Sequence, residues 1–132
     1  MILFGEWCAA GHSVAYTHLP DPFLLLDVAD PERQRFWSRN RRDAAAHLLG
    51  LAIVPLLQDN SRHTLHALSS EINQFQSLYH PGPPEGVILR QEDPHWCVAR
   101  AKLVRSDFSQ AIEEHWSSRP IEWNGIDYSH RA

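Results

Sequence analysis

The apolar residues of this chain fall in short runs, and these runs predict strands rather than long amphipathic helices. Residues 2–7 (ILFGEW) and 23–28 (FLLLDV) form two such runs, and neither has a helical period. Runs of this kind are typical of strands that are buried on both faces. The LPDP sequence at 19–22 predicts a turn, because proline removes a backbone donor and restricts the residue before it. We therefore expect two buried strands separated by a loop that ends at this turn.

The first helix is predicted by its caps. Ser38 is a residue type that commonly caps the N-terminus of a helix, and residues 39–49 favour a helix. Gly50 lies where a residue with left-handed backbone geometry commonly follows the last helical residue. The Asp30-Pro31-Glu32 sequence fits either an earlier helix start or a hairpin turn into a strand at 35–37. We favour the hairpin, because Ser38 offers the better helix start. Helical spacing predicts a buried helix face that consists of Ala44, His47, Leu48 and Leu51.

Capping residues also predict two later helices. The second begins at Asn60 or Ser61, which are both suitable caps, and runs to about Gln76. The third follows Ser106 and covers residues 107–117, with its apolar side chains on one face.

Three further strands are expected in the second half of the chain. Residues 52–57 (AIVPLL) predict an edge strand that Pro55 interrupts, since proline cannot donate to a central ladder. Residues 85–90 (EGVILR) and 96–104 predict an antiparallel pair joined by a turn. Together the elements predict an α+β fold, with a mainly antiparallel sheet and flanking helices.

Composition indicates one ordinary globular domain without a membrane segment. The chain has 132 residues, of which 43% are hydrophobic, and a formal charge of −4. No window approaches the roughly 18 apolar residues of a membrane span, and the first residues do not resemble a signal peptide. Cys8 and Cys97 lie far apart, which favours two free thiols and a cytoplasmic location.

Eleven of the twelve basic residues are arginines, and five of these are close in sequence. Such a cluster either meets phosphate or forms a solvated turn and helix face. The negative net charge gives no basic stripe, so we favour the solvated face. The clustered arginines are Arg33, Arg35, Arg39, Arg41 and Arg42.

Four ionisable residues lie at expected strand positions: Glu6, Asp27, Glu85 and Lys102. Burying such groups is costly unless they are paired or used. Their occurrence on four separate strands indicates that they converge on a polar pocket. The alternative is that each is a separate edge-strand charge, and that Asp27 caps the turn after its strand.

These positions belong to sequence motifs that resemble ATP-dependent RNA ligases of the covalent nucleotidyltransferase superfamily. The motifs are FGEW at 4–7, FLLLDV at 23–28, EGVILR at 85–90 and RAKLVRSDF at 100–108, and they occur in the order of the later ligase motifs. The resemblance implies a partial nucleotidyltransferase (ATP-grasp-like) ligase domain over residues 1–118, followed by a C-terminal tail at 119–132. It also implies ATP and RNA ends, with a 5′-phosphate and a 3′-hydroxyl, as binding partners.

The resemblance assigns the nucleoside to the first two motifs. Glu6 is expected to hold the ribose hydroxyls, and the FLLLDV strand is expected to line the adenine. The family has an aromatic residue immediately before the aspartate, where this chain has Leu26. Leucine covers a base but does not stack as a ring does, so Phe23 is a second candidate for the adenine contact.

The last two motifs are expected to contact the metal and the phosphates. Glu85 would position a divalent ion, Mg²⁺, which prefers oxygen ligands, and Asp27 is a second candidate ligand. Lys102 would neutralise the α-phosphate during transfer. Arg100 stands where the family often has another lysine and is a further candidate for the phosphate, although a guanidinium delivers its charge less compactly.

The nucleophile of the family is absent from this sequence. RNA ligases attack ATP with the lysine of a KxDG motif that precedes FGEW, but this chain begins at FGEW and contains only Lys102. Arginine cannot replace it, because the guanidinium stays protonated. We expect an incomplete ligase that does not self-adenylate alone: either a truncated reading frame, or one half of a split enzyme whose partner polypeptide supplies the KxDG half. The alternatives are a non-catalytic module that binds nucleotides or RNA ends, and an interaction protein that dimerises through an open sheet edge.

Overall fold

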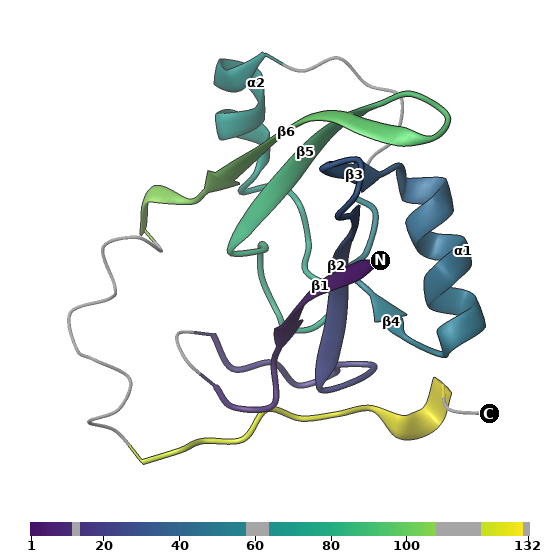
Figure 1. Cartoon of the computed structure of the whole chain (residues 1–132). Coiled ribbons are helices and arrows are strands. Elements are labelled where there is room, and N and C mark those ends of the chain that lie inside the picture. The colour runs from purple at the N-terminus through teal and green to yellow at the C-terminus, as the bar shows by residue number, and fades with distance from the viewer. Residues whose placement is uncertain (12–13, 58–63, 108–119, 131–132) are drawn as a thin grey trace.

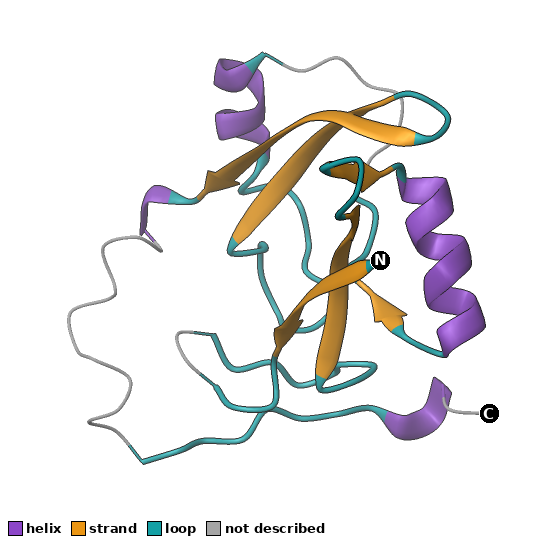
Figure 2. Ribbon diagram, viewed as in Figure 1, coloured by secondary structure: helices purple, strands orange, loops and turns teal. Residues whose placement is uncertain are grey.

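A single mainly antiparallel sheet organises the computed structural model, which describes residues 1–11, 14–57, 64–107 and 120–130 (Figures 1 and 2). The strands run in the order β1-β2-β3-β6-β5, and β4 pairs with β2. The α+β class and the mainly antiparallel sheet predicted from the sequence are confirmed. The elements are β1 (Ile2–Trp7), β2 (Phe23–Asp30), β3 (Arg35–Trp37), α1 (Arg39–Leu49), β4 (Ala52–Ile53), α2 (Leu65–Glu71), β5 (Gly86–Glu92), β6 (Trp96–Val104) and a 3₁₀ turn at Tyr128–His130.

Strand β2 is the buried centre of the sheet, as its apolar sequence predicts. Leu25 and Val28 are fully buried and pack with Ala46 of α1, while Leu24 packs into a second cluster with Cys8 and Leu19. The pairing with β1 shifts by one residue, from Phe4 opposite Asp27 to Gly5 opposite Leu25. This bulge leaves Leu26 without a partner on β1, and bulges commonly redirect the side chains beside them.

Strand β1 is exposed along its whole length, so the expectation that it is buried was wrong. It lies at the edge of the sheet and pairs with β2 alone. Its side chains include Ile2 at 46%, Phe4 at 43% and Trp7 at 65% exposure. The apolar run correctly indicated a strand, but it did not reveal whether another element covers that strand.

Helix α1 has the predicted ends but buries a different face. Gly50 has φ = 65°, and its N–H bonds the carbonyl of His47. Arg42 and Ala46 are the buried residues of this helix, whereas Leu48 is 85% exposed. The predicted inward face was therefore wrong, because small Ala46 lies against β2 and leaves Leu48 in solvent. No helix within the described ranges is long and apolar enough to cross a membrane.

Three other predicted elements differ in extent. β4 covers only Ala52–Ile53 and pairs in parallel with β2, since the chain turns away before Pro55. Helix α2 begins at Leu65, because Thr64 caps it by accepting from the N–H of Ala67 at 3.1 Å. It ends at Glu71, five residues before the predicted end. The helix predicted over 107–117 lies almost entirely outside the described residues.

The C-terminal segment 120–130 lies along the loop that follows β1, although no periodic pattern marks it in the sequence (Figure 1). Bridges join Ala10 to Trp123 and Leu19 to Ile126. Backbone bonds also run from Asn124 N to Ala9 O at 2.9 Å and from Asp127 N to Leu19 O at 2.8 Å. The C-terminal segment is therefore tied to the loop between β1 and β2.

Candidate functional site

One cavity of about 460 Å³ collects side chains from distant parts of the sequence. Its walls come from β1, β2, β5 and β6, together with the segments 54–57 and 75–80. Three of the ionisable residues predicted for the site line it: Glu6 on β1, Glu85 immediately before β5, and Lys102 on β6. The volume falls in the range of pockets that hold small ligands.

The sheet pairing brings Lys102 and the segment that contains Glu85 close together. In the β5–β6 ladder, Gly86 is opposite Val104 and Ile88 is opposite Lys102. Side chains that face each other across an antiparallel pair lie on the same side of the sheet, and Ile88 lines the cavity as Lys102 does. Glu85 precedes this ladder by one residue, and its carbonyl accepts from the N–H of Arg105 at 3.1 Å.

Two of the carboxylates that line the cavity, Glu6 and Glu85, lie near the thiol of Cys8. Burial, followed by the charges of Glu6 and Glu85, raises the pKa of Cys8 to about 11. The thiol therefore stays protonated at neutral pH and does not act as a nucleophile there. The shift also places both carboxylates in one electrostatic environment, as the predicted pocket requires.

Tyr16 contacts the predicted metal residue and was not identified from the sequence. Its hydroxyl donates to Oε1 of Glu85 at 2.7 Å, and its ring makes an edge contact with His80, with the centroids 5.6 Å apart. Burial, together with the hydrogen bond to Glu85, raises the pKa of Tyr16 far above its ordinary value. The phenol thus remains a donor over the whole physiological range. Only its position in the loop after the GEW strand distinguished this tyrosine in the sequence.

Asp27 does not line the cavity, and its observed contacts are ion pairs with two arginines. One oxygen accepts from Arg90, and the other accepts from Nη1 of Arg100 at 2.5 Å. The carboxylate is only 3% exposed, so the guanidinium groups compensate a charge that is costly to bury. Both oxygens are paired with guanidinium groups, and the role of Asp27 as a metal ligand stays a prediction.

Arg100 is directed away from the phosphate role that the motif implied. Besides its bond to Asp27, its guanidinium lies 3.6 Å from the ring centroid of Phe36. It belongs to a small surface hollow with Cys97, and the cavity that contains Lys102 does not include it. The cation–π contact and the ion pair fix Arg100 in a structural position.

The structure separates the two candidates for the adenine contact. Leu26 lines the cavity, whereas Phe23 packs with the cluster of Leu25 and Val28. A Cβ on Gly5 would lie 2.1 Å from the ring of Phe23, so this ring occupies the space that glycine leaves. Of the two candidates, Leu26 is therefore the one that lines the cavity, as Leu24 of the same motif also does.

Glu85 is the carboxylate that could bind a metal at this site, and it is not part of a complete set of metal ligands. Among the described residues, no three His, Cys, Asp or Glu side chains gather as potential metal ligands. Mg²⁺ fits such a site, because it commonly binds one or two carboxylates and takes its other oxygens from water and substrate phosphates. Glu85 has a second oxygen for this purpose, since Tyr16 donates to Oε1.

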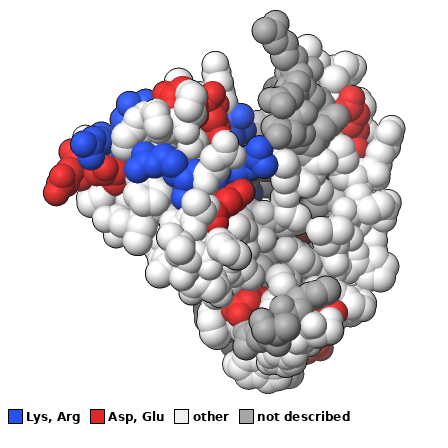
Figure 3. Space-filling model, turned by 90° about the vertical axis from the view of Figure 1, so that its right-hand side faces the viewer, with Lys and Arg blue, Asp and Glu red and all other residues white. Residues whose placement is uncertain are grey.

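The arginine cluster is largely neutralised by nearby acids. Arg33 pairs with Asp30 at 2.9 Å, and Arg35 lies 3.6 Å from Asp93. Figure 3 accordingly shows basic and acidic side chains intermixed in one region instead of a continuous basic face. This arrangement favours a solvated surface for Arg33 and Arg35, whereas Arg39 and Arg42 of the same cluster line the cavity, and Arg42 is buried.

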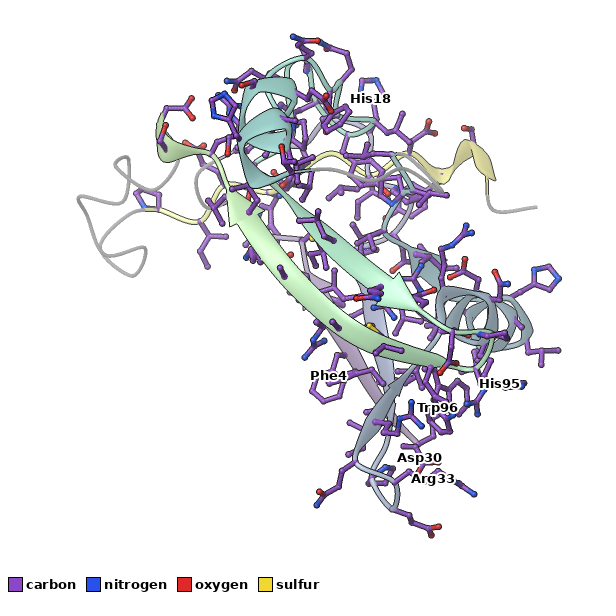
Figure 4. The ribbon with its side chains drawn as sticks, turned by 90° about the horizontal axis from the view of Figure 1, so that it is seen from above. Phe4, His18, Asp30, Arg33, His95 and Trp96 are labelled. Carbon is purple, nitrogen blue, oxygen red and sulfur yellow. The ribbon has the colours of Figure 1, made fainter. Side chains whose placement is uncertain are left out.

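Two tryptophans pack against Arg41 in the same region. The guanidinium of Arg41 lies 4.2 Å from the ring centroid of Trp37 and 4.7 Å from that of Trp96. Figure 4 shows His95 and Trp96 beside the start of α1, far from His18 at the other end of the molecule. These contacts join α1 to the β5–β6 turn and contribute to packing.

Comparison with known proteins gives one match. A family model described as RNA ligase matches residues 1–104, which include the first three motifs and the fourth as far as Val104. No curated protein and no solved structure matches the chain, so no structural neighbour confirms a nucleotidyltransferase fold. The family model covers well over half of the sequence, and it ends at the last residue of β6. The chain therefore belongs to the RNA ligase family.

Proposed function

We propose that this chain binds ATP and AMP in the 460 Å³ cavity, as the nucleotide-binding part of an RNA ligase. One observation carries the proposal: Glu6, Glu85 and Lys102 come from three distant motifs and line the same cavity. Membership of the RNA ligase family supports the choice of ligand, since the family generally uses ATP and a divalent metal.

Each residue has a role that suits its chemistry. Lys102 carries a compact positive charge to the α-phosphate, and within the described residues no ion pair neutralises it. Glu85 holds Mg²⁺, with water and phosphate oxygens as the remaining ligands. Glu6 accepts hydrogen bonds from the ribose hydroxyls, and Leu26 covers the adenine.

The family reaction needs one more group than this cavity supplies. A lysine amine attacks the α-phosphorus of ATP, a P–N bond forms and pyrophosphate leaves. The AMP then passes to an RNA 5′-phosphate, and a 3′-hydroxyl displaces it as the ends join. Lys102 is the only lysine among the 132 residues, and we assign it to the phosphate. We therefore propose that these residues do not self-adenylate alone, and that the reaction needs a KxDG lysine that they do not contain.

Two other functions remain as alternatives. A non-catalytic module that binds nucleotides or RNA ends would use the same cavity without any partner lysine. An interaction protein would instead use the exposed edge strand β1, because unpaired edges tend to find partners. Sedimentation separates the second alternative from the proposal: a stable dimer without nucleotide favours it, and a monomer that binds ATP excludes it as the sole function.

The assignment of Glu6 is tested with a sugar analogue. Hydrogen bonds to a charged acceptor contribute about 1.5–3 kcal/mol, or about tenfold or more in affinity. We expect the native chain to bind ATP about tenfold more tightly than 2′-deoxy-ATP, and Glu6→Ala to bind the two nucleotides equally. Calorimetric titration with Mg²⁺ measures both affinities, and Glu32→Ala, an exposed acid on the β2–β3 turn, is the control. An unchanged preference for ATP in Glu6→Ala contradicts the assignment.

A further inference from the structure

The contact between Tyr16 and Glu85 connects the proposed metal site to the C-terminal end of the described chain. Tyr16 lies in the loop after β1, and its hydroxyl bonds Oε1 of Glu85 at 2.7 Å. Glu85 follows two prolines and immediately precedes β5, which begins at Gly86. Glu85 therefore belongs to no helix or strand that would orient its carboxylate. The phenol is thus the group that fixes one of the two carboxylate oxygens.

Tyr16 is in turn held by residues more than a hundred positions away. Its N–H donates to Oδ1 of Asn124 at 2.9 Å, and its carbonyl accepts from the N–H of Gly125 at 2.8 Å. Nδ2 of Asn124 also donates to the carbonyl of Cys8 at 2.8 Å, so one amide side chain joins Cys8 and Tyr16. Both backbone polar groups of Tyr16 are therefore bound by the C-terminal segment.

The close approach of the two segments depends on a glycine. A Cβ on Gly125 would lie 2.7 Å from the carbonyl oxygen of Thr17, which is closer than real Cβ atoms come. The fit between the loop and the C-terminal segment is thus specific to this sequence. The C-terminal segment lies beyond the region that the family model matches, which ends at residue 104.

We propose that Tyr16 and Asn124 are positioning residues for Glu85, so that the C-terminal segment 122–127 forms a working part of the metal site. This inference rests on the proposed function, in which Glu85 holds Mg²⁺. Tyr16 restricts the carboxylate to one orientation and leaves its other oxygen for the metal. Asn124 keeps the Tyr16 backbone where the hydroxyl reaches Glu85. Groups that orient a metal ligand through a hydrogen bond commonly change metal affinity by about 10–100-fold when they are removed.

The test separates metal binding from nucleotide binding. Calorimetry measures the affinity for ATP with Mg²⁺ and again with EDTA, and the ratio of the two gives the contribution of the metal. We expect Tyr16→Phe to lower this ratio about tenfold and to leave the affinity in EDTA unchanged. Asn124→Ala should lower the ratio less, because Gly125 still bonds Tyr16. The double variant should match Tyr16→Phe alone, since both changes act through one contact.

Matched controls and a folding check complete the design. Tyr128→Phe removes another phenol, which lies on the 3₁₀ turn outside the cavity lining and is assigned no role in binding. Glu122→Ala changes an exposed side chain on the same segment and keeps its backbone bond to Gly11. Both controls should keep the native ratio. Thermal unfolding of each variant shows whether it is folded, and if Asn124→Ala does not fold, Tyr16→Phe alone decides.

The outcomes distinguish this proposal from the one it rests on. If Glu85→Ala loses the metal contribution while Tyr16→Phe keeps it, the positioning role is wrong and the metal site stands. Equal losses with and without Mg²⁺ in Tyr16→Phe indicate a merely structural role and also overturn the positioning role. If Mg²⁺ contributes nothing to the native chain, or Glu85→Ala keeps its contribution, the assigned metal site is wrong and both proposals fail.

Discussion

Replacing Lys102 by alanine is expected to weaken ATP binding by about ten- to a hundredfold. The change removes the only cation that we assign to the α-phosphate, and a hydrogen bond to a charged group contributes about 1.5–3 kcal/mol. The effect should be larger for ATP than for adenosine, because adenosine has no phosphate for the ammonium to contact. Calorimetric titration of the native chain and of Lys102→Ala with both ligands measures the difference directly.

Two controls make this result specific. Lys102→Arg keeps the positive charge and should retain part of the affinity, since a guanidinium reaches phosphate with a different geometry. Arg33→Ala removes an exposed cation that pairs with Asp30, outside the cavity, and should leave ATP binding unchanged. Equal loss of adenosine and ATP affinity in Lys102→Ala would indicate a disturbed fold instead of a lost phosphate contact, and would contradict the assignment.

The largest expected effect on stability belongs to Asp27→Asn. The substitution keeps the shape of the side chain but removes the charge that compensates Arg90, whose side chain is only 12% exposed. Breaking a buried ion pair by changing one partner commonly lowers the free energy of unfolding by about 3–5 kcal/mol. We expect a loss in that range, measured by urea unfolding monitored through tryptophan fluorescence.

A surface pair provides the comparison for this prediction. Asp30→Asn removes the partner of Arg33, whose side chain is 64% exposed, and should lower the free energy of unfolding much less than Asp27→Asn does. Combining Asp27→Asn with Arg90→Met should cost less than the sum of the two single changes, because the Asp27–Arg90 contact can be lost only once. Additive losses would contradict the view that Asp27 and Arg90 stabilise the sheet as a pair.

Much of the backbone follows from local sequence chemistry. Helix α1 begins after Ser38 and ends before Gly50 as its caps predict, and β3 occupies 35–37 as the hairpin interpretation requires. The runs of apolar residues predicted the positions of β1 and β2, since a short continuous apolar run is enough to indicate a strand. Burial was harder to predict: the sequence contains no signal that β1 lies at a sheet edge or that Ala46, instead of Leu48, contacts β2.

The candidate site was predicted in part, and its errors have a common cause. Glu6, Glu85 and Lys102 were expected to converge and do line one cavity. Asp27 and Arg100, however, bond each other across the sheet, from positions 73 residues apart. Tyr16 meets Glu85 across 69 residues. Contacts of this range depend on how the strands are ordered, and short motifs do not encode that order. Motifs identified which residues belong to the family pattern, but the structure assigns their partners.

The central claim is that this chain retains a nucleotide cavity without the amine that attacks ATP. Incubation with Mg²⁺ and ATP labelled at the α-phosphate tests both halves of the claim together. We predict that label is retained with the folded chain on native filters, and that none remains on the chain after denaturing electrophoresis. An acid-labile label on Lys102 would show that this residue is itself the nucleophile, and the absence of label on the native filter would show that the cavity does not bind the nucleotide. Either result would contradict the account.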